Sequence, residues 1–303
     1  MAVYVVGDFL RETRLRKGYT QEEVSYGICT PASLSRIENG AQKPGRLILE
    51  KLFERLGTEN NLFNSFVSRE EMELYLEIQT LIRNVTDGDL HRIEEQIDIV
   101  EKLTQNTSEL ERQSLFWAKG ELATQKYGNN GKAMEYLMKA IQITLPDFDG
   151  KSPLRNHLLT FDEITIINSI AVRHAENTSL LTAIQLDMWL KEYMENRVVD
   201  GRIKTAKYPM ILYNLSCWFG SEHCHKEALD IANQGVDFCV KYGNLVAFPR
   251  LILNQGIASV ELGQIDNAKK YLHQAVTIFE TMKRMDTVEY ITTWCRNEYQ
   301  IEI

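Results

Sequence analysis

Apolar positions in the first sixty residues recur every three or four residues, which is the spacing of amphipathic helices. The apolar face of a first helix, which ends before Gly18, consists of Val6, Phe9, Leu10 and Thr13. Glycine suits the left-handed position that closes a helix, and Gly57 ends the last helix of this segment in the same way. The pattern predicts four or five short helices.

Two of these helices begin at capping signals. Thr20 and Glu23 form a capping box, in which the hydroxyl and the carboxylate each accept a backbone N–H at the helix start. Thr30 precedes Pro31, and proline at the first helical position favours an extended residue before it, as an N-cap requires. Two short helices joined by a tight turn near Gly27 predict a helix-turn-helix.

The outer face of the second of these helices carries small and polar side chains and fits the major groove of DNA. Arginine pairs with guanine there through two hydrogen bonds, and serine pairs with several bases. Gln21 at a helix start and Lys43 in the following loop are placed to meet phosphates. The candidate DNA-contacting residues are Gln21, Pro31, Ala32, Ser33, Arg36 and Lys43. The alternative is a small helical bundle with a solvated polar face.

Residues 5–57, and most specifically the stretch LSRIENG, resemble the helix-turn-helix of the lambda-repressor-like (Xre) family. The resemblance implies an internal salt bridge between Arg14 and Glu38, and it places the candidate residues of the second helix on the DNA side. Pro31 departs from the family pattern because proline offers no hydrogen bond at that position. Some base recognition there would therefore be apolar.

From Glu70 onward the pattern predicts one helical hairpin after another, without strand-like alternation. Three segments align on small residues, and a small residue follows seven positions after each: Ala133 and Ala140, Ala228 and Gly235, Ala268 and Ala275. Weaker copies lie at 161–197 and 70–104. These segments resemble tetratricopeptide repeats, which implies a right-handed α-solenoid whose concave face is lined by the first helix of each pair.

Three asparagines share one register in these repeats, fourteen or fifteen residues before the small anchor of each. Each could pair with both the C=O and the N–H of an extended peptide. Lys119 holds the same register, and two further cations lie one or two turns before an asparagine. The candidate peptide-binding residues are Lys119, Asn168, Lys207, Asn214, Arg250 and Asn254. Alternatively, an asparagine in a helix satisfies a carbonyl of a neighbouring helix.

The chain of 303 residues has a formal net charge of -8, but residues 1–60 hold nine Lys/Arg against eight Asp/Glu, so the acidity lies in the repeats. No export signal or membrane span is indicated. Five scattered cysteines fit reduced thiols in a cytoplasmic protein. No catalytic motif or cofactor site is recognisable, and the possible metal ligands between Cys217 and His225 lack a second half-site, so neither an enzyme nor a metal protein is expected.

A helix-turn-helix followed by about five tetratricopeptide-like repeats resembles the RRNPP family of quorum-sensing regulators, of the Rgg, PlcR and PrgX types. The resemblance implies an all-α homodimer that binds a palindromic operator in double-stranded DNA and is controlled by a short signalling peptide, held by Asn168, Asn214 and Asn254. We expect a DNA-binding domain with its linker at 1–66 and a peptide-binding and dimerisation domain at 67–303. The alternative is a scaffold whose repeats bind a protein partner.

Overall fold

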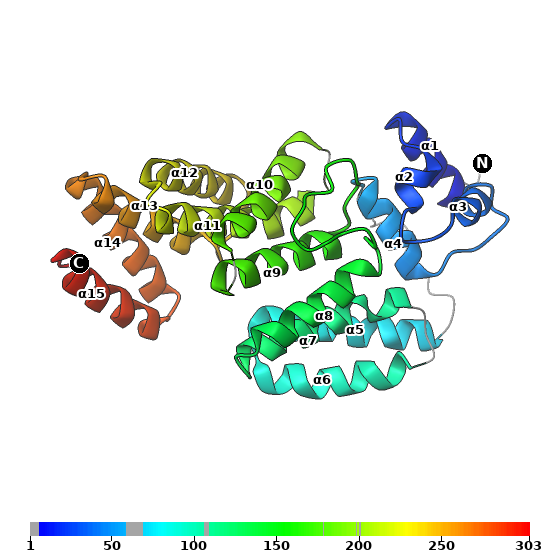
Figure 1. Ribbon diagram of the computed structural model, residues 1–303, viewed down its shortest axis with the longest axis horizontal. Helices are drawn as coiled ribbons and strands as arrows, with labels where there is room; N and C mark the ends of the chain where they lie inside the picture. Colours follow the sequence, from blue (N-terminus) through cyan, green and yellow to red (C-terminus); the bar gives the residue numbers. More distant parts are fainter. Residues whose placement is uncertain (1–5, 59–68, 106–108, 178, 198, 200) are drawn as a thin grey trace. The chain divides into compact units, whose positions relative to one another are not determined.

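The structure, a computed structural model, describes residues 6–58, 69–105, 109–177, 179–197, 199 and 201–303 (Figure 1). Every regular element in these residues is a helix, which confirms the all-α prediction. None of the described helices has the length and hydropathy of a membrane span. The chain divides into two compact units, Met1–Trp189 with Asn196–Asp200 and Leu190–Glu195 with Gly201–Ile303.

The first unit begins with a four-helix head, which consists of α1 (Val6–Arg16), α2 (Gln21–Ser25), α3 (Pro31–Glu38) and α4 (Arg46–Arg55). Both predicted caps are present. The Thr20 hydroxyl accepts the Glu23 N–H at 3.1 Å, and the Glu23 carboxylate accepts the Thr20 N–H at 2.7 Å. Thr30 caps α3 by accepting the Ser33 N–H at 3.1 Å. The buried core of the head includes Leu10, Val24, Leu34, Ile37, Leu49, Leu52, Phe53 and Leu56.

Helical hairpins make up the rest of the first unit. Its helices are α5 (Arg69–Asp87), α6 (Leu90–Leu103), the 3₁₀ turn η1 (Glu109–Arg112), α7 (Gln113–Gln125), α8 (Asn130–Gln142) and α9 (Phe161–Asn177). The predicted anchors Ala133 and Ala140 are fully buried. A Cβ on Gly120 of α7 would lie 2.9 Å from Cγ of Leu137 on α8, so the pair packs closely because this position has no side chain.

Residues 143–160 connect α8 to α9 without regular structure. Leu145, Phe148 and Leu159 of this segment are buried, and Leu158 packs into the hydrophobic core of the head. The connection therefore belongs to the interface between the head and the first repeats, a role that its sequence did not reveal.

The second unit contains α11 (Gly201–Ser221), α12 (His225–Tyr242), α13 (Phe248–Glu261), α14 (Ile265–Thr281) and α15 (Met285–Tyr299), while α10 (Leu180–Asn196) contributes to both units. Anchors Ala228 and Ala268 are buried. A Cβ on Gly235 would lie 2.7 Å from Cδ2 of Leu251. Small residues thus let the helices of neighbouring pairs approach, which is the packing expected of tetratricopeptide-like repeats.

Candidate functional site

The predicted DNA-contacting face of α3 is exposed. Pro31, Ala32 and Arg36 are exposed, as is Lys43 in the loop that follows, whereas Ser33 is half-buried. The N-cap at Thr30 fixes the start of α3, and the buried side chains of Leu34 and Ile37 face the head core. This face presents one guanidinium, one ammonium and small side chains to an approaching ligand, which suits a DNA groove.

Arg36 is held in place by two neighbours. Its Nε donates to Oε1 of Gln42 at 3.0 Å, and its Nη2 donates to Oγ of Ser33 at 3.1 Å. The backbone N–H of Gln42 also donates to the Arg36 carbonyl at 3.2 Å. Gln42 was missed from sequence because its role depends on how the chain folds back after Gly40. Its place in the loop that contains Lys43 was the one available signal.

The predicted salt bridge between Arg14 and Glu38 is confirmed and is buried. Nε and Nη2 of Arg14 donate to the two carboxylate oxygens of Glu38 at 2.6 and 2.8 Å. This hydrogen bonding raises the pKa of Arg14 further above its ordinary value. Nε2 of Gln21 donates to the same carboxylate at 2.7 Å. The side-chain amide of Gln21, which was predicted to meet a phosphate, is therefore bound to the carboxylate of the Arg14–Glu38 salt bridge.

In the first unit, two predicted peptide-binding residues lie on α7 and α9. Nζ of Lys119 is 2.7 Å from the Glu101 carboxylate on α6. The side-chain amide of Asn168 donates to both carboxylate oxygens of Asp187 on α10, at 3.2 and 3.0 Å, and Asp187 is fully buried. Asn168 thus binds an acceptor on the next helix. This resembles the alternative in which an asparagine satisfies a polar group of a neighbouring helix and not a peptide.

The other four predicted peptide-binding residues lie in the second unit, Lys207 and Asn214 on α11 and Arg250 and Asn254 on α13. Lys207 and Asn214 are half-buried. The guanidinium of Arg250 lies 5.7 Å from the centre of the Tyr213 ring. The amide of Asn254 donates to Sγ of Cys217 at 3.2 Å and reaches the Tyr213 carbonyl at 3.5 Å.

Tyr213 and Cys217 on α11 therefore join the group that the sequence placed around Asn254. Burial raises the pKa of Tyr213 to about 12 and also raises the pKa of the Cys217 thiol, so both side chains are neutral at physiological pH. The group offers one guanidinium and several neutral polar atoms, which suits a backbone or a carboxylate. Asn168 belongs to the first unit, whereas Asn214 and Asn254 belong to the second.

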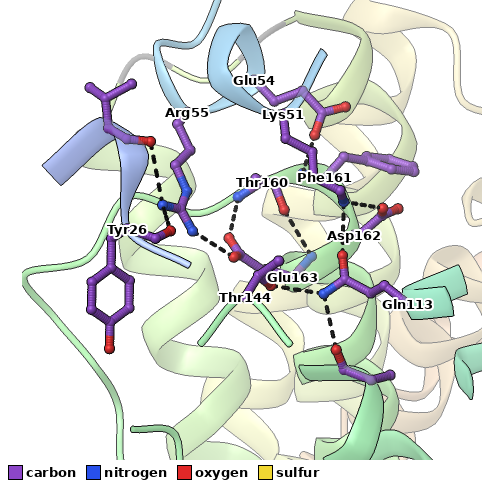
Figure 2. Close-up of polar contacts among 12 residues, drawn as sticks. Tyr26, Lys51, Glu54, Arg55, Gln113, Thr144, Thr160, Phe161, Asp162 and Glu163 are labelled. Carbon is purple, nitrogen blue, oxygen red and sulfur yellow. Dashed lines mark hydrogen bonds and ion pairs between the residues drawn. The ribbon is translucent and has the colours of Figure 1, made fainter. Parts of the chain in front are cut away.

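The head is attached to the repeats by a cluster of charged side chains, which we term the α4–α9 joint: Lys51, Glu54 and Arg55 of α4, Gln113 of α7, and Asp162 and Glu163 of α9 (Figure 2). Nη2 of Arg55 is 2.7 Å from the Glu163 carboxylate, and their side chains are 1% and 0% exposed. Nζ of Lys51 is 2.6 Å from Asp162 and donates to Oε1 of Gln113 at 2.8 Å.

Local structure on the repeat side positions these acceptors. Glu163 accepts the Thr160 N–H at 2.6 Å while the Thr160 hydroxyl accepts the Glu163 N–H at 3.3 Å, so the carboxylate that binds Arg55 also caps α9. The Gln113 amide donates to the Ala140 carbonyl at 3.0 Å and to Oγ1 of Thr144 at 2.8 Å (Figure 2). The Thr-x-x-Glu spacing at 160–163 was the signal in the sequence for this cap.

Contacts from the turn after α2 extend the joint. Arg55 also donates to the Tyr26 carbonyl, and the Tyr26 hydroxyl donates to Asp147 in the segment between α8 and α9. A Cβ on Gly27 would lie 2.0 Å from the Thr144 carbonyl oxygen, so only glycine permits this approach. The joint therefore uses α4 and the end of α2, and it leaves the outer face of α3 uncovered.

The head is similar to known helix-turn-helix proteins. A family model described as a helix-turn-helix domain matches residues 5–66. The uncharacterized HTH-type transcriptional regulator YqaF of Bacillus subtilis (strain 168) is 38% identical over 63 residues, which cover 20% of this chain and 83% of YqaF. The chain belongs to the HTH-type transcriptional regulators.

Over nearly its whole length the regulator is similar in fold to solved structures. Bacillus thuringiensis PlcR in complex with the peptide PapR7 and DNA matches with a TM-score of 0.61 and 19% identity, covering 95% of this chain and 98% of that chain. The apo form of PlcR matches with a TM-score of 0.58 and 18% identity over the same shares. A putative transcriptional regulator from Listeria monocytogenes EGD-e matches at 0.50 and 14%, covering 97% of each chain. These likenesses confirm the predicted fold.

The side chains between Cys217 and His225 form no three-residue cluster of metal ligands. No group of three or more His, Cys, Asp or Glu side chains suited to a metal ion occurs among the residues that the structure describes. All five cysteines are free thiols, and Cys239 and Cys295 are buried in the helical packing. The regulator's candidate sites are the α3 face and the residues around Asn168, Asn214 and Asn254.

Proposed function

We propose that this regulator binds double-stranded DNA through α3 and that a short signalling peptide, bound by the inner helices of the repeats, controls that binding. The observation that carries the proposal is the exposed face of Pro31, Ala32, Arg36 and Lys43 on a helix-turn-helix. It is supported by a fold shared over 95% of the chain with PlcR, which was solved with both a peptide and DNA.

On the DNA side, Arg36 is the residue to contact a base edge, and Lys43 and the N-terminus of α2 contact phosphates. Because residues 1–60 carry almost no net charge, one head binds DNA weakly. The protein therefore acts as a cytoplasmic homodimer, which places two heads on a palindromic operator with half-sites about 34 Å apart. Two heads together bind DNA more tightly than one.

On the peptide side, Asn214, Asn254 and Arg250 form the proposed site in the second unit, and Asn168 and Lys119 form its counterpart in the first. Asn168 and Asn254 already donate to acceptors within the protein. A peptide would compete for these amides or use their oxygen atoms. Asn214 holds the register of Asn254 one repeat earlier in the second unit, and it is the residue that we substitute first.

The test is fluorescence anisotropy of the full chain on DNA from upstream of its own gene, with and without synthetic peptides encoded by the adjacent reading frame. Arg36→Ala should lose sequence preference at a cost of about 1–3 kcal/mol and keep its response to peptide. Asn214→Ala should bind DNA normally and lose the peptide response. Arg16→Ala on α1 and Asn267→Ala on α14, both exposed positions, are the matched controls.

Either half of the proposal can fail separately. Binding to all DNA sequences with equal affinity would refute the assignment of α3. Specific DNA binding that responds to no peptide would refute peptide control and favour the alternative in which the repeats bind a protein partner, consistent with the internal hydrogen bonds of Asn168 and Asn254.

A further inference from the structure

The α4–α9 joint contains more carboxylates than cations. Lys51 and Arg55 contribute two cations, whereas Glu54, Asp162 and Glu163 contribute three carboxylates. Each cation is bound to one carboxylate of α9, Lys51 to Asp162 at 2.6 Å and Arg55 to Glu163 at 2.7 Å. The third carboxylate, Glu54, accepts the backbone N–H of Phe161 at 3.0 Å (Figure 2).

Burying one more anion than cations is costly, because the low dielectric constant of an interface strengthens repulsion and removes hydration. The cost is relieved when one carboxyl takes up a proton. Glu163 is committed to Arg55 and to the cap of α9, and Asp162 is committed to Lys51. Glu54 is the carboxyl whose protonation leaves both ion pairs intact.

We propose that docking of the head onto the repeats is coupled to uptake of one proton by Glu54. The joint is closed when Glu54 is neutral and loosens when Glu54 ionises. Docking fixes the orientation of the head, so this coupling makes that orientation depend on pH within the physiological range. The inference concerns docking alone and does not require the proposed peptide.

The surroundings of Glu54 favour its neutral form on balance. Burial raises the pKa of Glu54 to about 8, and the charges of Asp162 on α9 and Glu50 on α4 add to the rise. The Lys51 ammonium and the hydrogen bond from the Phe161 N–H oppose it. A cavity of about 190 Å³ lies beside Glu54, and its lining includes Arg46 and Glu111. Glu54 is only partly buried and faces this cavity, so protons can exchange with solvent.

The sign of the effect follows from linkage. In an undocked head Glu54 would be hydrated and have an ordinary pKa of about 4.3. Between that value and about 8 the docked form holds a proton that the undocked form has lost, so the docking constant falls by up to about tenfold per pH unit as pH rises. Below and above this window docking is independent of this group.

The test is hydrogen exchange of the full chain at pH 6.0 and 7.5. Protection of the amides of residues 159–163, corrected for intrinsic exchange rates, reports how firmly the head is docked. In the wild type their protection should fall about twentyfold between the two pH values. Glu54→Gln introduces a neutral side chain of the same shape. At both pH values this variant should show the protection that the wild type has at pH 6.0. Glu22→Gln, which removes an exposed carboxylate of α2 outside the joint, should retain the wild-type dependence.

Protection in the wild type that does not change with pH would overturn the proposal. A pH dependence that persists in Glu54→Gln would also overturn it and would point to His157, whose ring packs 4.7 Å from that of Tyr26 at the same interface. Should Glu54→Gln not fold, a carbon-13 NMR titration of the Glu54 carboxyl in the wild type decides the matter. A midpoint near 4.3 refutes the proposal, and a midpoint above 6 supports it.

Discussion

Replacement of Arg14 by methionine would leave a buried carboxylate without its cation. Glu38 is 1% exposed and receives two hydrogen bonds from Arg14, at 2.6 and 2.8 Å. Methionine fills the space but donates nothing, and the Tyr19 carbonyl also loses the Arg14 hydrogen bond of 2.9 Å. Gln21 would remain as a neutral donor to Glu38.

Removing one partner of a buried ion pair costs about 3–5 kcal/mol, because the other charge stays buried and uncompensated. A domain the size of the head has a total stability of about 3–9 kcal/mol. We therefore expect Arg14→Met to remove most of the stability of the head. The double variant Arg14→Met/Glu38→Leu buries no charge and should recover at least half of that loss.

Hydrogen exchange of the α3 amides reports the opening of the head within the full chain. A loss of 3–5 kcal/mol lowers their protection by about two to three and a half orders of magnitude. Arg11→Ala is the control, since Arg11 is exposed and its contact with Asn39 is long, at 3.4 Å; it should change stability by less than about 0.5 kcal/mol. A loss below about 1 kcal/mol in Arg14→Met, or a double variant as unstable as the single one, would refute the reasoning.

Three further outcomes are expected. Thr20→Ala removes the cap of α2 and should cost about 0.5–2 kcal/mol, measured by protection of the α2 amides. Gly256→Val places a Cβ 2.6 Å from Cδ2 of Leu272 and should destabilise the second unit by about 1–3 kcal/mol, seen as a lower calorimetric Tm. Burial raises the pKa of Cys239 to about 11, so iodoacetamide should modify it more slowly than the partly exposed Cys224 at pH 8, and its rate should rise with pH up to about 11, as followed by mass spectrometry.

Much of the head could be predicted because its signals are local. The caps at Thr20 and Thr30 act on backbone groups three residues away. Gly18 follows the end of α1 with a φ of +74°, a conformation that glycine adopts without strain. The spacing of Leu34 and Ile37 indicated which side of α3 faces the core, and so which side faces outward. These predictions hold in the folded protein because the interacting groups lie within the same short helix.

The repeats were predictable in outline but not in the partners of their polar residues. The shared register of the asparagines predicted equivalent positions on the first helix of each pair. Register alone did not indicate that Asn168 would meet the buried Asp187, or that Asn254 would meet Cys217. A periodic pattern fixes the direction of a side chain relative to its own helix, whereas the atom it meets depends on the neighbouring helix.

By itself, then, the sequence determined the helices, the helix-turn-helix with its outward α3 face, and the pairing of helices around small anchors. Only the tertiary structure decided how the head is attached. Lys51 meets partners 62 and 111 residues away, Gln113 and Asp162, and Glu54 receives the backbone N–H of a residue 107 positions later. Caps and periodicity act within about one helical turn, so they carry no information about a charge cluster assembled from α4, α7 and α9.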